Sequence, residues 1–407
     1  MRTPKINAPE EFIYDNTKRR NKVIIRETRE YELITPLFGG GAITKQADEV
    51  SVVRTTEIRG HLRFWWRATR GGQFATIQEL REHEDAIFGS TEKNSALQID
   101  LTVTNRGETF PDQQGQPIDS IRSPLGYVAF PLRGENAEVI ENIEFSVQFS
   151  YPSNFAEDLK ASIWAWETFG GLGARTRRGF GAIQRKDYLP LNRNAVETDI
   201  QNGLTTHLNG NTWADDVPHL TAFASNTYKI TNARNSMVDA WKHIIDSYQR
   251  FRQFRRPTRF SRSNWSEPDA IRRLFPTRSH PTHSTPKTIV DKFPRANFGL
   301  PIIFKFKDDD VRDGDPTTTT LEGCNEKQKR LASPLIFRVL KCADEKYVGI
   351  AIILSGIRVP TGGVILKDAP VNPIIQTDLT STEASSAYLD DILNGNTNVL
   401  EAFLAIL

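Results

Sequence analysis

Residues 170–181 read GGLGARTRRGFG and place five glycines around three arginines. The pattern before this segment predicts a helix over 155–169, and the pattern after it predicts a strand over 180–188. In dinucleotide-binding folds the glycine motif instead follows a strand and opens a helix, and the third glycine of GxGxxG would here fall at Thr176. The segment therefore excludes that fold. Glycine lets the backbone approach a ligand closely and guanidinium groups fit phosphate oxygens, so the segment favours binding to a polyanion; the alternative is a glycine-rich turn with solvated arginines.

The composition is that of a globular protein with a local rather than a global basic character. Its 407 residues fit two domains of ordinary size, and its formal net charge is only +2. The two cysteines form no zinc-type spacing, and we expect no metal and no cofactor. The longest apolar run, 347–354, is too short to span a bilayer, and residues 1–12 show no secretory-signal pattern. We therefore expect a cytoplasmic protein.

The order of predicted elements is that of an α+β protein. In a first domain, over 1–190, it is compatible with a ferredoxin-like unit carrying long insertions. A polar, asparagine-rich stretch at 190–220 marks the predicted boundary, and a second domain covers 191–407. The elements predicted for the first domain are strands at 23–38, 97–103, 125–131, 143–149 and 180–188, with helices at 58–69 and 155–169. Those predicted for the second are helices at 234–251 and 383–405, with strands at 300–306, 335–340 and 347–354.

The helix predicted at 58–69 has one basic and one apolar face. At 100° per residue its arginines fall within an arc of about 80°. These residues are Arg59, Arg63, Arg67 and Arg70. The preceding glycine-rich loop adds Lys45 and Arg54. This basic stripe is a candidate wall of an RNA groove, although arginines at such spacing also occur on plain solvated faces.

A third basic segment lies at 250–278, where nine arginines face only two acidic residues. Aromatic residues interleave with the arginines, a pattern expected for single-stranded nucleic acid, unless the aromatic rings belong to the core. These rings are Phe251, Phe254, Phe260 and Trp265. The candidate RNA contacts here are Arg255, Arg256 and Arg259.

Signals for catalysis are weak. His61 has no serine or cysteine partner in a recognised motif, and His280 and His283 lack the HExxH context of a zinc site. Asp48 and Glu49 have no second acid/base group to work with. We therefore assign no catalytic and no metal-binding residue.

Two segments resemble the RAMP superfamily of CRISPR proteins. They are 31–72 (YELITPLFGGGAITKQADEVSVVRTTEIRGHLRFWWRATRGG) and 169–183 (FGGLGARTRRGFGAI). The first most closely resembles the first RAMP subunit of type III-B effector complexes. The second domain matches less specifically, chiefly at 295–306.

The resemblance implies two tandem ferredoxin-like (RRM-like) domains in a non-catalytic subunit that takes part in antiviral defence. Such a subunit binds guide and target RNA near the 3′ end of the guide and assembles with other RAMP subunits, while neighbouring subunits cleave the target. The RNA-facing positions implied by the matched motifs are Arg54, Arg59, Arg63, Trp66, Arg67, Gly170, Gly171, Gly173, Arg175, Arg177 and Arg178. Two alternatives stay open: an endoribonuclease that processes guide precursors through His61, and an end cap whose arginines contact acidic partner subunits.

Overall fold

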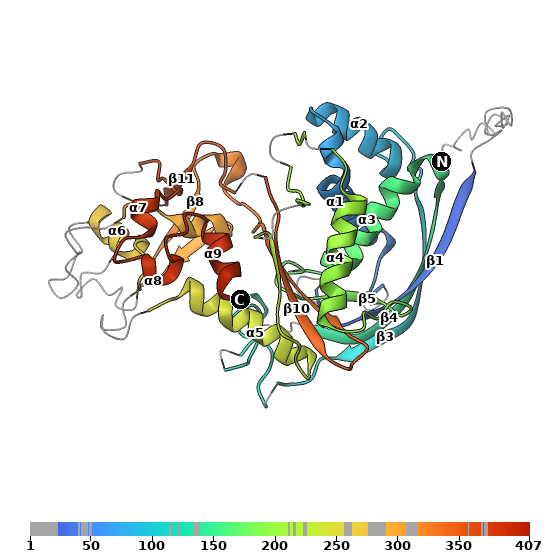
Figure 1. The fold of residues 1–407 in the computed structure, drawn as a ribbon, viewed down its shortest axis with the longest axis horizontal. Helices are drawn as coiled ribbons and strands as arrows, with labels where there is room; N and C mark the ends of the chain where they lie inside the picture. Colours follow the sequence, from blue (N-terminus) through green and yellow to red (C-terminus); the bar gives the residue numbers. More distant parts are fainter. Residues whose placement is uncertain are drawn as a thin grey trace, which may run out of the picture.

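The computed structural model combines helices with antiparallel sheets, which confirms the α+β class (Figure 1). It describes residues 23–39, 41, 48, 51–113, 115–120, 122–133, 139–210, 212–214, 217–222, 226–255, 263–275, 290–306, 316, 318–356, 358–367, 369 and 373–407. Within these residues, no helix is both long and apolar enough to cross a membrane.

The first sheet is built around β1 (Ile24–Leu33). This strand pairs antiparallel with β4 (Val139–Pro152) on one side and β5 (Ile183–Arg185) on the other. Strand β4 also pairs with β3 (Gln98–Thr109) and with the short β2 (Leu37–Phe38). The strands predicted at 23–38, 97–103, 143–149 and 180–188 are therefore present, with different ends.

Four helices accompany this sheet. Helix α1 (Thr55–Arg70) packs against α3 (Ala156–Phe169), and both are close to their predicted bounds. Helices α2 (Ile77–Phe88) and α4 (Arg193–His207) were not predicted. Figure 1 shows α1, α3 and α4 together on the concave side of the curved sheet. The strand predicted at 125–131 is wrong: turns and the 3-10 helix η3 (Phe130–Leu132) occupy these residues, because a glycine interrupts the apolar run and a proline lies at each of its ends.

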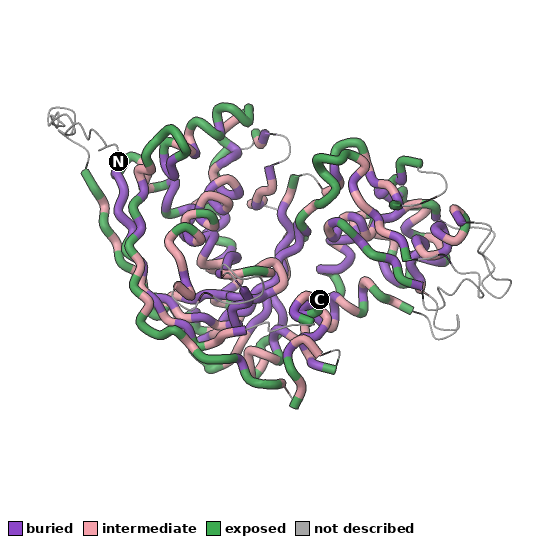
Figure 2. The backbone as a smooth tube through the Cα atoms, turned by 180° about the vertical axis from the view of Figure 1, so that it is seen from behind, coloured by how far each residue is buried: buried purple, intermediate pink, exposed green. Residues whose placement is uncertain are grey.

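The second sheet has the order β6–β10–β9 and is buried on both faces. Its strands are β6 (Tyr228–Ile230), β9 (Leu335–Lys341) and β10 (Tyr347–Ile353). One face joins the core beneath α4, and the other packs on α5 (Met237–Arg252) and α9 (Val399–Ile406). Figure 2 shows the strands in this central region largely in the buried colour.

The predicted boundary at 190 does not separate the hydrophobic cores. Val196 and Ile200 of α4 share one core with residues of the first sheet, and that core also contains Ile336 and Ile350 of the second sheet. The division into 1–190 and 191–407 therefore stays a prediction about domain organisation. The two parts of the chain share a continuous packed seam.

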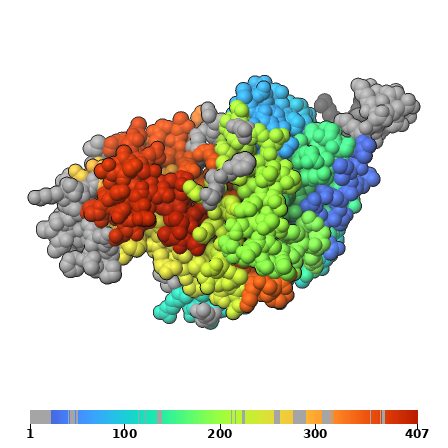
Figure 3. All heavy atoms as spheres, in the orientation of Figure 1, coloured from blue at the N-terminus to red at the C-terminus, as the bar shows by residue number. Residues whose placement is uncertain are grey.

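A small third sheet, in the order β11–β8–β7, forms a separate core near one end of the molecule. Its strands are β7 (Ile302–Phe304), β8 (Thr319–Gly323) and β11 (Val364–Leu366), and α6 (Glu267–Leu274) packs beside it. The helix predicted at 383–405 is divided into α7 (Ser381–Ala384), α8 (Asp390–Leu393) and α9. Figure 3 shows the C-terminal residues gathered on the opposite side of the molecule from the N-terminal ones, with α4 on the surface between them.

Candidate nucleic-acid interface

The glycine-arginine segment lies at the seam between the two parts of the chain. The Arg177 side chain donates to the carbonyl oxygen of Ser333, and Nη1 of Arg178 donates to the carbonyl oxygen of Leu335 at 2.9 Å. From the other direction, Nε1 of Trp241 donates to the backbone oxygen of Arg178 at 2.8 Å. Two of the three arginines therefore fasten β9 and α5 to the first part.

Arg175, the third arginine of the segment, has a different environment. Its backbone φ is +60°, a left-handed conformation that costs an L-residue about 1–2 kcal/mol. Its Nε is buried, and no described residue accepts a hydrogen bond from it. Burial, reinforced by the neighbouring charge of Arg178, lowers the pKa of Arg175 to about 10. A strained backbone and a buried Nε without an acceptor occur together at this one residue, a combination found at binding sites.

Arg175 lines a pocket of about 620 Å³ that both parts of the chain enclose. We call this pocket the seam pocket. Six of its side chains are cationic and one, Asp246, is a carboxylate. The cationic side chains are Arg122, Arg133, Arg175, Arg178, Lys242 and Arg252. Asp246 is already paired with Lys242, so the pocket keeps a strong positive charge in a chain that is almost neutral.

Arg252 at the end of α5 supplies a second desolvated cation. Its Cζ lies 5.3 Å from the centre of the Tyr248 ring, and its Nη1 donates to the Tyr127 hydroxyl at 3.2 Å. Burial alone would lower the pKa of Arg252, but these two tyrosines outweigh it and raise that pKa. The guanidinium therefore stays charged inside the pocket, and its buried Nε has no acceptor among the described residues.

The glycines of the segment serve packing against the protein itself. A Cβ on Gly170 would lie 2.7 Å from Nε1 of Trp65, and a Cβ on Gly171 would lie 2.6 Å from the oxygen of Gly181. Gly173 has a φ of +77° and donates its N–H to the carboxylate of Glu57. The prediction that Gly170 and Gly171 face RNA is therefore wrong for this structure, because both are buried against neighbouring protein atoms.

The basic stripe of α1 faces α2 rather than an open groove. Arg63 and Arg67 each lie 3.3 Å from a carboxylate oxygen of Glu84, which is buried on α2. Nη1 of Arg59 donates to the backbone oxygen of Leu97 at 3.2 Å. Burial raises the pKa of Glu84 although both arginines oppose that rise. Glu84 of α2 therefore pairs with two of the four arginines of the stripe, and the groove between the stripe and the glycine-arginine segment stays a prediction.

Trp66 is a core residue, and its prediction as an RNA-facing residue is wrong. The ring is fully buried, and its Nε1 donates to Oδ1 of Asp158 at 3.0 Å. Arg70 lies 3.4 Å from the same carboxylate oxygen. Arg54 is half-buried at the start of α1, where its backbone oxygen accepts the first helical hydrogen bond from Ile58.

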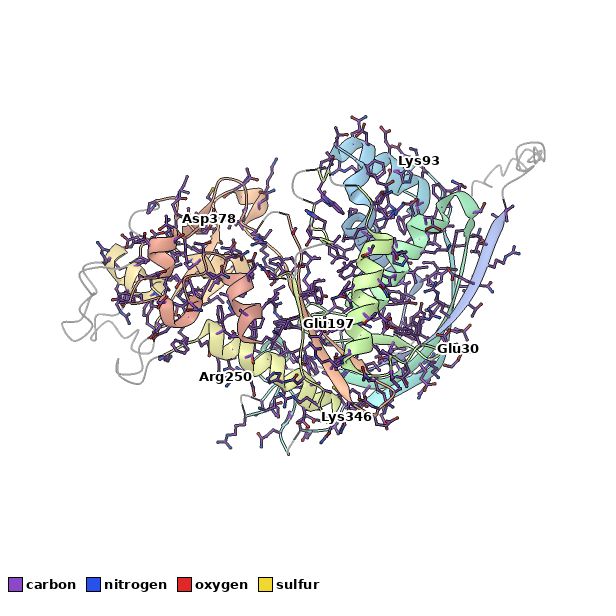
Figure 4. The ribbon with its side chains drawn as sticks, in the orientation of Figure 1. Glu30, Lys93, Glu197, Arg250, Lys346 and Asp378 are labelled. Carbon is purple, nitrogen blue, oxygen red and sulfur yellow. The ribbon has the colours of Figure 1, made fainter. Side chains whose placement is uncertain are left out.

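The third basic segment divides between core and surface. Phe251 and Trp265, predicted as stacking platforms, are buried in the second core. Arg250 lies on the exposed side of α5 (Figure 4), and Arg255 is exposed and forms a β-bridge with Ser263. Lys45, Arg256, Arg259, Phe260, His280 and His283 lie outside the described residues.

His61 and the glycine-arginine segment approach the same carboxylate. Nε2 of His61 lies 3.7 Å from Oε1 of Glu57, the oxygen that accepts from Gly173. Phe64 of α1, which had no expected role, lies under Arg177, whose Cζ is 5.3 Å from the ring centre. Helix α1 therefore does contact the segment, but through a different face from its arginine stripe. No cluster of possible metal ligands occurs among the described residues.

Sequence reasoning missed the side of the seam pocket that residues 122–133 form. The wrong strand prediction over 125–131 concealed this turn, which carries Arg122, Tyr127, Phe130 and Arg133. The signal was present in the sequence: two prolines and a glycine lie between two arginines within twelve residues.

A comparison with protein-family models gives a match in the first part of the chain. Residues 30–184, in the first part of the chain, match the RAMP superfamily model. This match confirms the resemblance seen in the sequence.

The particular relatives are Cmr1 proteins. The chain is 28% identical over 191 residues to the CRISPR system Cmr subunit Cmr1-1 of Pyrococcus furiosus, covering 45% of this chain and 52% of that protein. It is also 28% identical over 176 residues to Cmr1-2 of the same organism, covering 38% of this chain and 92% of that protein. The chain thus spans about half the length of the first of these relatives.

Among solved structures, one chain of a type III-B Cmr-beta complex bound to cognate target RNA and AMPPnP shares the fold. The TM-score is 0.51 at 14% identity, covering 95% of this chain and 98% of that one.

Proposed function

We propose that this protein is a non-catalytic RNA-binding subunit of a type III-B CRISPR effector complex, acting in the cytoplasm in antiviral defence. In this proposal it contacts guide and target RNA near the 3′ end of the guide and assembles with other RAMP subunits. The observation that carries it is the seam pocket, where six cationic side chains surround one carboxylate and Arg175 has an unsatisfied Nε. Phosphate groups are the natural counterions for such a site.

The names of the relatives support the proposal that the protein works in a type III-B complex. The Pyrococcus proteins are named as Cmr subunits, and the solved complex with a similar fold is bound to target RNA. In an RNA-guided complex of this kind, base pairing reads the sequence and the protein holds the backbone. A pocket rich in arginine suits a protein that holds the RNA backbone.

The topology supports two ferredoxin-like units. In the first part, the order β5–β1–β4–β3, with α1 and α3 in the crossovers, is that of a βαββαβ unit. In the second part, β6–β10–β9 with α5 after β6 gives the same order without a fourth strand in the described residues. The seam pocket then lies between two related domains, a usual place for a ligand site.

Equilibrium binding to single-stranded RNA at several salt concentrations tests this proposal. We expect the double variant Arg122→Gln plus Arg175→Gln to weaken binding about 10-fold or more and to reduce the slope of log affinity against log salt by one to two units, since about two phosphate contacts are removed. The matched control is Arg26→Gln plus Arg81→Gln, two exposed arginines on β1 and α2. Wild-type protein that binds no RNA, or equal loss in both double variants, would overturn the proposal.

The arginine stripe offers a second comparison in the same assay. Arg63→Gln plus Arg67→Gln should lower thermal stability, because Glu84 then loses its partners, but it should leave the RNA affinity of the folded protein unchanged. A loss of affinity equal to that of the pocket variant would place RNA on α1 and α2 instead.

The alternative of an endoribonuclease that uses His61 has one observation in its favour, the proximity of His61 to Glu57. Incubation of the purified protein with repeat RNA in the absence of metal decides between the two. Cleavage that His61→Ala abolishes would replace the non-catalytic function.

A further inference from the structure

Phe130 is an exposed aromatic residue on a turn that hydrogen bonds hold together. The ring is 56% exposed, while Ala129 and Leu132 on either side of it are buried at 0% and 2% exposure. Residues 130–132 form η3, and Nη2 and Nε of Arg133 donate to the backbone of the same turn, at Gly126 and Asp119. The exposure of Phe130 is therefore not a consequence of a loosely held loop.

Arg175 lies against this ring. Its Cζ is 5.2 Å from the centre of the Phe130 ring, close enough for a cation–π contact. The ring keeps more than half of its surface exposed even with the guanidinium over it. Arg175 lies over one face of the Phe130 ring, and the exposed remainder of the ring lies beside a guanidinium whose Nε has no acceptor among the described residues.

The geometry points to a stacking clamp: Phe130 holds one unpaired base of single-stranded RNA, while Arg175 contacts the phosphate of the same strand. This inference rests on the proposed function and adds to it the class of RNA that the seam pocket accepts. The bases of a duplex are stacked on one another and offer no free face, so the clamp selects single strands over duplex RNA.

The dimensions and lining of the pocket agree with a nucleotide. A volume of about 620 Å³ exceeds the lower limit of ordinary small-ligand sites, about 300 Å³, and leaves room for a base with its sugar and phosphate. Phe130 and the Tyr127 and Tyr248 rings line one continuous pocket with the arginines. An acidic peptide would satisfy the arginines but would leave the exposed ring without a planar partner, which is why we favour RNA.

The test uses the full chain and a single-stranded RNA of about 10 nucleotides with one 2-aminopurine base, together with a duplex of the same length. Fluorescence of 2-aminopurine falls when the base stacks on an aromatic ring, and anisotropy gives the affinity. The variants are Phe130→Leu, which keeps the apolar volume without the aromatic ring, and Phe130→Trp, which restores a stacking surface. Leu191→Ala, at a residue 68% exposed elsewhere, is the control.

We expect wild-type protein to quench the fluorescence and to bind the single strand at least about 10-fold more tightly than the duplex. Phe130→Leu should lose the quenching and weaken single-strand binding about 10-fold, the effect of one lost stack, while Phe130→Trp and Leu191→Ala keep both. Thermal melting checks that each variant is folded.

Three results would overturn the clamp. One is unchanged quenching and affinity in Phe130→Leu while wild-type protein binds RNA normally, which leaves the proposed function intact. Another is equal binding of single strand and duplex. The third is displacement of the RNA by polyglutamate at equal concentration, which would mean that the pocket is an acidic-peptide site. Wild-type protein that binds neither RNA would overturn the clamp and the proposed function together.

Discussion

Nη1 of Arg178 donates a 2.9 Å hydrogen bond to the carbonyl oxygen of Leu335. This hydrogen bond joins two segments of the chain that are 157 residues apart in the sequence. Nη2 of the same guanidinium donates to the Tyr248 hydroxyl at 3.2 Å. Arg178 and Tyr248 both line the seam pocket. One residue of the glycine-arginine segment therefore contributes to the seam between the two parts and to the site that we assign to RNA.

Replacement of Arg178 by alanine should therefore destabilise the whole chain. The guanidinium donates three hydrogen bonds, of which two, to Leu335 and Tyr248, cross the seam. Each of these two is worth about 1.5–3 kcal/mol, so we expect a decrease of roughly 3–6 kcal/mol in the free energy of unfolding. Urea denaturation followed by tryptophan fluorescence measures it. Arg26→Ala, at an exposed residue on β1, should change the free energy by less than about 0.5 kcal/mol. A similarly small effect at Arg178 would contradict its role in the seam.

Arg175→Gly should reduce RNA affinity without reducing the stability of the fold. Glycine adopts the positive φ of this position freely and removes the buried, unsatisfied Nε, while it also gives the unfolded chain more freedom. The melting temperature should therefore stay equal or rise slightly, within about 1 kcal/mol of stability, whereas RNA affinity should fall about 10-fold. Parallel melting and binding curves check both. A large loss of stability would mean that Arg175 supports the fold rather than a ligand.

The buried carboxylate of Asp158 should give the protein a measurable sensitivity to acid. Burial alone would raise the pKa of Asp158, but hydrogen bonds from His83 and Trp66 and the charge of Arg70 outweigh it, and the pKa lies below its ordinary value of 3.8. A carboxylate whose pKa is lowered by folding stabilises the native state above pH 3.8, and that stabilisation is lost as the pH falls through the folded-state pKa.

Comparison of wild-type protein with Asp158→Asn tests this sign. At pH 7 the variant should be less stable, by about 1–3 kcal/mol, because Arg70 and Trp66 lose the negatively charged acceptor at position 158. As the pH falls below 3.8 and through the folded-state pKa, the difference between the two proteins should shrink. A difference that grows on acidification would contradict the assignment.

The sequence predicted the elements of the first sheet better than the surroundings of the arginines on α1, because the elements give local signals and the surroundings depend on tertiary contacts. Alternating and apolar patterns in β1, β4, α1 and α3 are local signals, and these elements were found. The pairing of Glu84 with Arg63 and Arg67 is a tertiary contact made by a helix that was not predicted. Thr76 and Glu79 do form the capping box that begins this helix, so a local signal for α2 existed.

The candidate site was predicted in part. Arg175 was among the predicted contacts, and the structure places it in the seam pocket. The pocket also requires Arg122 and Phe130 from one loop and Arg252 from α5, which approach only when the two parts of the chain pack together. No spacing in the sequence connects these residues. The site forms where the two parts of the chain pack together. That packing depends on hydrogen bonds from side chains such as Arg177 and Arg178 to backbone oxygens far away in the sequence, which no local pattern predicts.

Photocrosslinking would show whether RNA occupies the seam pocket. Single-stranded RNA that carries 4-thiouridine would be bound to the full chain, irradiated and digested, and the crosslinked peptides would be identified by mass spectrometry. If RNA occupies the seam pocket, crosslinks should appear in the peptides that contain Tyr127 and Phe130 and should be lost in the Arg122→Gln plus Arg175→Gln variant. Crosslinks confined to the peptides of α1 and α2, with none in residues 122–133, would contradict it.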